Sequence, residues 1–459
     1  MILVKVNPMQ KQATSHATSI VKKLTQSGYK AYFAGGCVRD LIMGIEPKDI
    51  DIATSATPDQ VLKLFSKTFE KGKSFGVVSV LLGGHEFEVT TFRKEGSYFD
   101  GRHPTKVTWT DDKEDALRRD FTINGMFYDP LQKKIIDYVD GQKDIEKKII
   151  RTIGDPRDRF NEDKLRLMRA VRFSARFQYE IASETRSALV DLAPLLSEVS
   201  LERIRDELIK ILTGENAHQG IDLLSQVGIL SLILPEIETM KGVAQPPQFH
   251  PEGDVYIHTL LLLENFKKPN PELAMAGLLH DVGKPPTFSV KERIRFDGHV
   301  EVGTEMAQKI CKRLRFSNKQ VDHITSLVRQ HLQFMNVRRM RKSTLTRFLT
   351  QDRFEDHLEL HRADCLACHK ILDNYEFCKE KLKELKLKPR PKKPLLTGKD
   401  LIRLGFTPGP IFKKILTAIE TEQLEGKLKT KNSALKWAQY KFSSHLPSKK
   451  KHKKKRPRK

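Results

Sequence analysis

The chain has 459 residues, with 82 Lys and Arg against 58 Asp and Glu, and a formal net charge of +24. This length exceeds one compact core, so we expect roughly two to four domains, and the positive charge favours a polyanionic partner such as nucleic acid. Five unevenly spaced cysteines argue against a disulfide framework, and because no apolar run reaches about 18 residues we expect no membrane span and a cytoplasmic protein.

The first 150 residues predict an α/β region. Apolar residues at helical spacing cover 8–28, and short strands are expected at 31–34, 50–53, 76–82 and 86–92. Gly83 and Gly84 predict a tight hairpin between the last two strands. We therefore expect a head domain over residues 1–150.

A glycine pair followed by two aspartates is the most informative feature of this head. Gly36 and the glycine before it allow the backbone to approach a polyphosphate, and Arg39 adds a positive charge beside it. Asp49 and Asp51 stand two residues apart in the expected strand, so both carboxylates would face the same side. Two Mg²⁺ ions need such paired carboxylates beside a phosphate site for phosphoryl transfer. We predict nucleotide chemistry here, with a solvated surface turn as the alternative.

A third carboxylate for the two ions is expected on the strand 86–92. Glu86 and Glu88 share one face of that strand, and Glu88 lies nearer its Thr-Thr-Phe-Arg end, so we favour Glu88. The alternative is that these charges protect a sheet edge from aggregation. The segment 94–104 contains Gly, Asp and Pro and predicts a mobile loop that repositions substrate.

An Arg-Arg-Asp sequence follows. Asp120 stands before an apolar run and predicts a helix N-cap, with Arg118 and Arg119 immediately before the helix. Arginines beside a helix N-terminus form a triphosphate site. The alternative is an exposed arginine pair.

Four charged residues recur every third position and predict one face of a helix: Asp163, Arg166, Arg169 and Arg172. Cytosine and adenine each present an amine donor beside a ring-nitrogen acceptor, so Asp163 can accept from the amine while Arg166 donates to the ring nitrogen. Guanine and uracil present the opposite polarity and would leave both groups unpaired. The alternative is an amphipathic helix with ordinary ion pairs.

Taken in order, these motifs resemble those of class II tRNA nucleotidyltransferases and the related bacterial poly(A) polymerases. The resemblance is carried by GGCVRDLIMG, KDIDIAT, EVTTFR, the loop with DGRHP, RRDFTING and EDKLRLMRAVRF, and it is dense over residues 30–240. It implies an α+β fold in which a polymerase β-like nucleotidyltransferase head precedes a helical neck and body. It also implies addition of CCA to tRNA 3′ ends from CTP and ATP with Mg²⁺. One departure is Gly125, where the family usually has alanine.

The resemblance assigns roles to the residues named above. Asp49 and Asp51 correspond to the metal-binding pair, which Glu88 would complete as a third catalytic carboxylate. Nucleotide and triphosphate contacts correspond to Gly36, Arg39 and Arg119. Base reading corresponds to Asp163 and Arg166, with Arg169 and Arg172 assisting.

A second predicted site follows an apolar helix that ends in a His-Asp doublet. Further histidines and an aspartate stand around it, and the whole set is His258, His280, Asp281, His299, His331 and Asp364. Such ligands contributed by several helices suit a divalent transition metal. Their order resembles the HD phosphohydrolase superfamily, so we predict an HD domain at 250–385. Whether it hydrolyses phosphate esters or only binds RNA stays open at this point.

The C-terminal part predicts a helical module and a basic tail. Alternating Pro and Lys at 386–394 predict a boundary. The module at 395–445 resembles the C-terminal module of HD-containing enzymes. Residues 446–459 predict a disordered tail that tethers RNA nonspecifically. With the helical neck and body at 151–242, this completes the predicted domain order.

The leading hypothesis is therefore a template-independent enzyme that adds CCA to tRNA. A poly(A) polymerase and a partial enzyme that adds only CC or only A are the nearest alternatives. Two further alternatives are an HD phosphohydrolase whose head merely binds nucleotide and a noncatalytic RNA-binding protein. The sequence does not indicate an oligomeric state.

Overall fold

The computed structural model describes residues 8–72, 76–95, 107–248, 250–251, 253–387 and 394–446. These form two compact units, Met1–Val328 and Arg329–Lys459, and the division falls inside the segment predicted as an HD domain. Most of the predicted loop at 94–104, most of the boundary at 386–394 and tail residues 447–459 lie outside the described residues. Among the described residues, no helix is long and apolar enough to cross a membrane.

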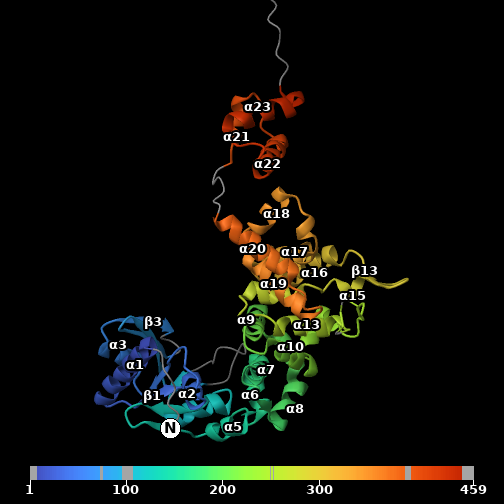
Figure 1. Ribbon diagram of the computed structural model, residues 1–459. Helices are drawn as coiled ribbons and strands as arrows, with labels where there is room; N and C mark the ends of the chain where they lie inside the picture. Colours follow the sequence, from blue (N-terminus) through green and yellow to red (C-terminus); the bar gives the residue numbers. More distant parts are fainter. Residues whose placement is uncertain are drawn as a thin grey trace, which may run out of the picture. The chain divides into compact units, whose positions relative to one another are not determined.

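The first unit begins with a mixed sheet in the strand order β3-β4-β5-β2-β1-β8-β9. Its strands β1 and β3 are labelled in Figure 1. Its strands are β1 (Ala31–Ala34), β2 (Ile52–Thr54), β3 (Thr68–Gly72), β4 (Val77–Leu82), β5 (His85–Thr91), β8 (Phe127–Asp129) and β9 (Lys134–Ile136). The helices of this head are α1 (Pro8–Gln26), α2 (Gly36–Ile42), α3 (Pro58–Leu64), α4 (Asp112–Leu117) and α5 (Gly141–Lys147), with a 3₁₀ turn η2 (Thr122–Asn124). A small hairpin of β6 (Arg93–Glu95) and β7 (Val107–Trp109) stands beside the sheet.

Two local predictions in the head are confirmed. The strand at 31–34 is β1, and the glycine pair forms the turn between antiparallel β4 and β5, with positive φ angles of 61° at Gly83 and 80° at Gly84.

The strand predicted at 50–53 is wrong at its start. β2 begins at Ile52, so Asp49 and Asp51 precede the strand rather than alternate along it. β1 ends at Ala34, where the chain turns into α2. At this end of the β1–β2 pair, the Ala34 amide donates a backbone hydrogen bond to the Asp51 carbonyl at 2.9 Å. Residues before Asp51 therefore lack a strand partner in β1.

The rest of the first unit is mainly helical. Its helices are α6 (Pro156–Glu162), α7 (Leu165–Phe177), α8 (Ser183–Leu192), α9 (Leu201–Leu212), α10 (Ala217–Gln226), α11 (Ile229–Ile233), α12 (Pro235–Glu238), α13 (Val255–Glu264), α14 (Pro271–Leu279), α15 (Lys284–Thr287), α16 (His299–Arg313) and α17 (Asn318–Gln330). The prediction of an entirely helical region misses two small sheets, β10 (Ile149–Ile150) with β11 (Glu180–Ile181) and β12 (Phe288–Val290) with β13 (Ile294–Phe296). Both are too short to show a clear alternating pattern.

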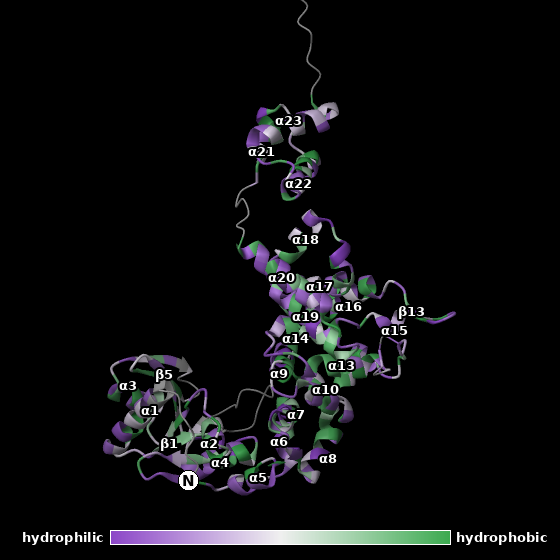
Figure 2. Ribbon diagram, in the orientation of Figure 1, coloured by the Kyte–Doolittle hydropathy of each residue, from purple (hydrophilic) through white to green (hydrophobic). Residues whose placement is uncertain are grey.

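Helix α7 is packed into the helical part of the first unit. Leu167, Met168 and Val171 are fully buried, where α7 packs against α9 and α10. Each such side chain contributes about 1.5–3 kcal/mol by leaving water. This burial fixes the helix and so fixes the direction of its arginine face. Helix α13, which packs against α10, is mostly apolar in sequence and is coloured accordingly in Figure 2.

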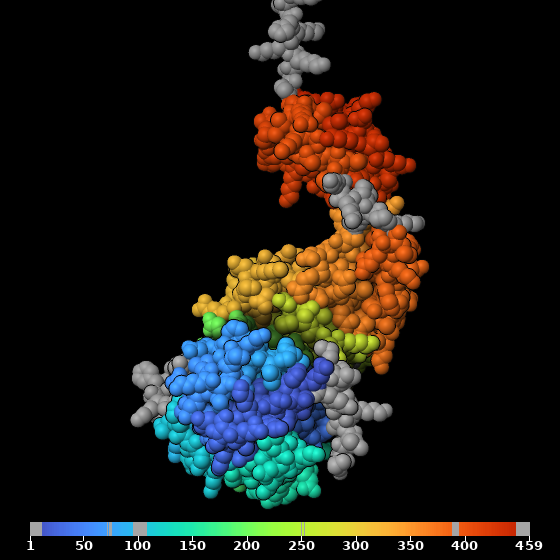
Figure 3. Space-filling view, turned by 90° about the vertical axis from the view of Figure 1, so that its left-hand side faces the viewer, coloured from blue at the N-terminus to red at the C-terminus, as the bar shows by residue number. Residues whose placement is uncertain are grey.

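The second unit contains two apolar clusters. One lies among η4 (His331–Arg339), α18 (Lys342–Leu349), α19 (Phe354–Ala367) and α20 (Asp373–Leu387). The other is the core of a compact body at 394–446, red in Figure 3, built from α21 (Gly398–Arg403), α22 (Pro410–Leu424) and α23 (Lys431–Lys441). The segment predicted as a C-terminal module thus has an apolar core of its own.

Candidate active site

The glycine pair sits at the turn from β1 into α2, and the first glycine is the constrained one. Gly35 has φ 72° and ψ −129°, and a Cβ there would lie 2.8 Å from Nη1 of Arg119. A Cβ on Gly36 would lie 3.5 Å from Arg39, an ordinary contact. The close approach therefore belongs to Gly35, the residue before the predicted contact Gly36.

The predicted acidic cluster forms by strand pairing and not by alternation. Parallel pairing of β2 with β5 aligns Ile52 with Val89, which places Asp51 next to Glu88. Limited solvation raises the pKa of Asp51, the Glu88 and Asp49 carboxylates raise it further, and Arg119 opposes them. Carboxylates that repel one another in this way fit a divalent cation, which supplies the missing positive charge.

The helix start predicted at Asp120 is wrong. Arg118 and Arg119 follow the C-terminal end of α4, and the short turn η2 after them has Phe121 as its N-cap residue. The Asp120 carboxylate is instead engaged across the fold. It accepts hydrogen bonds from Nε and Nη2 of Arg169, at 2.9 and 2.5 Å, and from Nδ2 of Asn124 at 3.1 Å.

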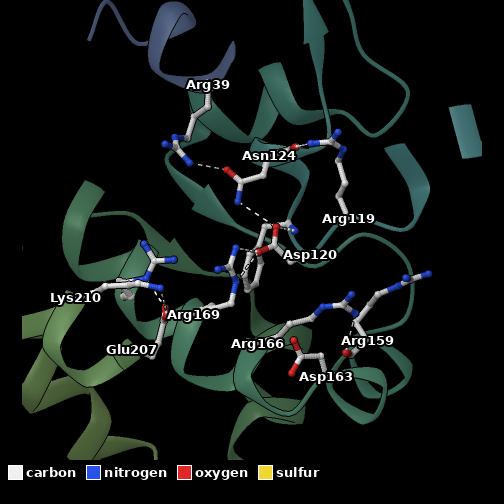
Figure 4. A network of polar contacts seen from close by, with 12 residues as sticks. Arg39, Arg119, Asp120, Asn124, Arg159, Asp163, Arg166, Arg169, Glu207 and Lys210 are labelled. Atoms are coloured by element: carbon white, nitrogen blue, oxygen red, sulfur yellow. Dashed lines mark hydrogen bonds and ion pairs between the residues drawn. The ribbon is translucent and has the colours of Figure 1, made fainter. Parts of the chain in front are cut away.

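Asp120 is the centre of a polar network that joins the head to the neck (Figure 4). Burial by itself would raise its pKa, but the Arg169 guanidinium and the Asn124 amide hold that pKa at about 2. Asn124 in turn accepts a 2.5 Å hydrogen bond from Nη1 of Arg39. Arg39 is buried, also donates to Asp40, and lies over the Phe177 ring at 4.7 Å. The predicted nucleotide contact Arg39 is thus part of the site's framework.

The predicted continuous helix face breaks at its first member. Asp163 ends α6 with an extended backbone, φ −141° and ψ 103°, and α7 begins at Leu165. The Asp163 carboxylate caps the amide of Leu165 at 3.1 Å and accepts from Nη2 of Arg203 at 3.0 Å. Asp163 therefore stands just before α7, and its carboxylate accepts a hydrogen bond from the first amide of that helix. It is not part of the helix face that it was predicted to share.

The three arginines of α7 do share a face, and each has a carboxylate partner. Arg166 donates to Glu162 at 2.6 Å, Arg169 to Asp120, and Arg172 to Glu207. Glu207 is completely buried and also binds Lys210. These ion pairs hold the three guanidinium groups in fixed positions.

One cavity of about 550 Å³ collects most of the predicted site. Of the predicted residues, its lining contains Gly36, Arg39, Asp51, Arg119, Asp163, Arg166, Arg169 and Arg172. Asp49 and Glu88 are not part of the lining. Across the whole lining, eight arginines stand against three aspartates, an excess that suits a polyanionic ligand.

Sequence reasoning missed several lining residues: Asn124, Phe173, Arg176 and Arg203. Arg176 had a usable signal, since it stands four residues after Arg172 on the same helix. Arg203 had none, because it comes from α9 and meets Asp163 only through tertiary packing.

The predicted second site is partly assembled within the first unit. His258 and His280, which are buried, approach each other at 3.3 Å between their Nε2 atoms, and His280 lies 3.1 Å from Oδ2 of Asp281. His299 is 4.0 Å from Oδ1 of Asp281. His331 and Asp364 belong to the second unit, in η4 and α19, and their part in this site stays a prediction.

A buried lysine pairs with the aspartate of this cluster. Nζ of Lys284 lies 2.6 Å from Oδ2 of Asp281 and donates to Oε1 of Gln245 at 2.6 Å. Burial would raise the pKa of Asp281, but the neighbouring His280 and Lys284 hold it well below its ordinary value. The donor set suits a divalent ion, while the ammonium group supplies a positive charge of its own.

Comparison with known proteins agrees with this geometry. The "Poly A polymerase head domain" matches residues 31–151, the "Probable RNA and SrmB-binding site of polymerase A" matches 178–241, and "tRNA nucleotidyltransferase domain 2" matches 298–438. A CCA-adding enzyme of Lactobacillus johnsonii is 39% identical over 274 residues, which cover 59% of this chain and 68% of that enzyme. The chain belongs to the family of CCA-adding enzymes.

Other members of the family bear out the predicted α+β architecture. The chain is 49% identical over 211 residues to the CCA-adding enzyme of Bacillus pumilus, although the match covers 46% of this chain and only 52% of that relative. Matches to the first curated relatives thus span about half of their length. The crystal structure of the Bacillus stearothermophilus CCA-adding enzyme in complex with CTP has a TM-score of 0.73 and 29% identity, and the match covers 96% of this chain and 99% of that one. Nucleotidyltransferases of this family use divalent metal ions.

Proposed function

We propose that this protein is a template-independent nucleotidyltransferase that adds C and A, from CTP and ATP, to tRNA 3′ ends. The observation that carries the proposal is the single cavity that joins Asp51 of the head to Asp163 and Arg166 of the neck. Chemistry and base selection need such adjacency, because a nucleotide must reach both at once. Its relatives are CCA-adding enzymes, one of them solved with CTP. With tRNA as substrate, we place the activity in the cytoplasm.

Asp49, Asp51 and Glu88 would hold the metal ions, which we propose to be Mg²⁺. The bound ions would activate the RNA 3′-hydroxyl and stabilise the pyrophosphate leaving group. The protein would contribute these carboxylates, of which the pairing of β2 with β5 supports a close approach of Asp51 and Glu88. Arg119, whose charge acts on Asp51, would receive the triphosphate. Gly35 leaves space for that guanidinium.

The base would be read at the junction of α6 and α7. Asp163 would accept from the exocyclic amine of cytosine or adenine, and Arg166 would donate to the ring nitrogen. In the structure these two groups bind Arg203 and Glu162 instead. A bound base would therefore exchange with existing ion pairs, so an ill-matched base, which cannot replace those contacts, would be rejected.

The experiment is incorporation of labelled CTP and ATP, separately and together, into tRNA that lacks its 3′ CCA. Addition of two C from CTP alone, and of one A only when both are supplied, would establish CCA addition. Long A tracts on arbitrary RNA would instead establish a poly(A) polymerase. Addition of only CC or only A would establish a partial enzyme, and no addition would overturn the proposal.

We also propose a second activity, metal-dependent phosphoester hydrolysis at the His-Asp cluster. The supporting observation is the convergence of His258, His280 and Asp281, each buried although polar. The proposed set also includes His299, which lies 4.0 Å from Oδ1 of Asp281. Hydrolysis of bis-p-nitrophenyl phosphate with Mn²⁺, Co²⁺ or Ni²⁺ would support it, provided that the activity is lost in an Asp281→Asn variant shown to be folded. No hydrolysis with any of these ions would favour a cluster that serves only the fold.

A further inference from the structure

One buried carboxylate behind the cavity binds both arginines of the Arg-Arg-Asp sequence. Asp115 of α4 is 1% exposed. Its Oδ1 accepts from Nε and Nη2 of Arg118, at 2.9 and 2.7 Å. Its Oδ2 accepts from Nε and Nη2 of Arg119, at 3.3 and 3.0 Å. A single side chain thus receives four hydrogen bonds from two neighbouring guanidinium groups.

The position of Asp115 separates it from any ligand. Arg118 and Arg119 line the cavity, but Asp115 does not. Each guanidinium group turns one edge to Asp115, and Nη1 of Arg119 lies on the other side, near the Asn124 carbonyl at 3.5 Å. Asp115 therefore acts on a ligand in the cavity through the residues that it binds and not by direct contact.

Electrostatics requires such a partner. Two adjacent guanidinium groups repel each other, and one carboxylate between them offsets half of that charge while fixing both orientations. A fixed orientation matters because flexible arginines lose side-chain entropy when they bind a phosphate. Arg119 also lies over the Phe127 ring at 5.1 Å, so it is held by a ring and by a carboxylate.

A further hydrogen bond connects this carboxylate to the strand that carries Glu88. The backbone amide of Arg93 donates to Oδ1 of Asp115 at 3.1 Å. Arg93 begins β6, two residues after β5 ends at Thr91. Asp115 thereby joins the arginines to the end of the strand that presents the acidic cluster.

We propose that Asp115 is a positioning residue that holds Arg118 and Arg119 as a two-arginine clamp for the nucleotide triphosphate. Its hydrogen bond from the Arg93 amide keeps this clamp in a fixed position relative to β5, the strand that carries Glu88. This inference rests on the proposed function. It assigns Asp115 no contact with the substrate and no part in choosing between C and A. Its removal should therefore weaken every triphosphate alike.

The test uses the full-length Asp115→Asn variant, with Glu114→Gln as the matched control. Glu114 stands next to Asp115 on α4 but pairs with Lys94 at the surface. In Asp115→Asn, we expect KM for CTP and for ATP, and the inhibition constant of pyrophosphate, to rise together by about 10-fold, since a charged hydrogen-bond partner is lost. The ratio of C to A incorporation should not change, and the control should behave as the wild type.

Several results would overturn the inference. These are an unchanged KM in a folded Asp115→Asn variant, a fall in kcat alone, or a changed preference between CTP and ATP. If Asp115→Asn does not fold, Asp115→Glu replaces it, because that variant keeps the charge but displaces the carboxylate; a normal KM there would equally reject the clamp.

A binding measurement separates this inference from the proposed function. Calorimetric titration with CTP and with inorganic triphosphate measures how tightly the two arginines bind the triphosphate group, and it does not depend on an addition reaction. If the wild-type chain binds both but adds no nucleotide, the proposed function fails while Asp115 is still tested. If both additions proceed but Asp115→Asn binds inorganic triphosphate normally, only the clamp fails.

Discussion

Asp51 lies beside Glu88 because β2 runs parallel to β5 and aligns the residues that follow each carboxylate, Ile52 and Val89. The two acids are far apart in the sequence, yet the Glu88 carboxylate adds to burial in raising the pKa of Asp51. A parallel pair between these two strands is thus what assembles the proposed metal site.

Removal of either acid should impair catalysis without unfolding the protein. Asp51→Asn should lower kcat by about 10³-fold, since bound metal supplies several kcal/mol of charge stabilisation. Glu88→Gln should act in the same direction and raise the Mg²⁺ concentration needed for half-maximal rate. Glu86→Gln, on the same face of β5, is the control and should retain activity. Equal losses in Glu86→Gln and Glu88→Gln would contradict the assignment of Glu88.

The two adjacent glycines should respond differently to alanine. Gly35→Ala should cost about 1–3 kcal/mol because Gly35 adopts a positive φ, and it should also displace Arg119 and raise KM for nucleotides. Gly36→Ala should change stability by less than about 1 kcal/mol, since Gly36 starts a helix and its added Cβ makes only an ordinary contact. Thermal unfolding of both variants decides the matter; an equally stable Gly35→Ala would show the prediction to be wrong.

Asp120 should make stability depend on acid pH. Its folded pKa of about 2 lies below the ordinary 3.8, so its contribution is present above pH 3.8 and is lost as pH falls toward 2. The contribution is about 2 kcal/mol. Asp120→Asn should unfold more easily at neutral pH, and the difference from wild type should shrink below pH 4. Urea unfolding at several pH values measures this, and a difference that does not vary with pH would refute it.

Asp163 should control which bases are accepted. Asp163→Asn replaces an acceptor by a group that can also donate, so incorporation of UTP and GTP relative to CTP and ATP should rise by about 10- to 100-fold. Asp158→Asn, an exposed acid in the first turn of α6, is the matched control and should keep the wild-type preference. If both variants still reject UTP and GTP equally, Asp163 does not read the base.

Asp281 should matter for stability whether or not its cluster is catalytic. Asp281→Asn leaves the buried Lys284 without its carboxylate and should cost about 3–5 kcal/mol. The double variant Asp281→Asn with Lys284→Met removes both charges and should recover much of that loss. Calorimetric unfolding compares the two. A double variant less stable than Asp281→Asn would contradict the ion-pair explanation.

The parts of the site that depend on residues close together in the sequence could be predicted. Arg166, Arg169 and Arg172 share a helix face because three-residue spacing dictates it, and the structure agrees. The same spacing led to a wrong prediction for Asp163, because spacing does not reveal that its carboxylate caps the start of a new helix. The prediction for Asp120 is wrong for a similar reason. An Asp before an apolar run is typical of an N-cap, but Arg169 of α7 binds this carboxylate instead.

By itself, the sequence determined the family resemblance, the strand at 31–34, the glycine hairpin and the arginine face of α7, because each depends on residues adjacent in the chain or on one helical period. Three relationships became visible in the folded protein alone: Glu88 lies beside Asp51, Gly35 and not Gly36 makes the close approach, and Arg203 binds Asp163. These relationships depend on strand register and helix packing, which arise from burial of apolar side chains over the whole unit. No local pattern encodes them.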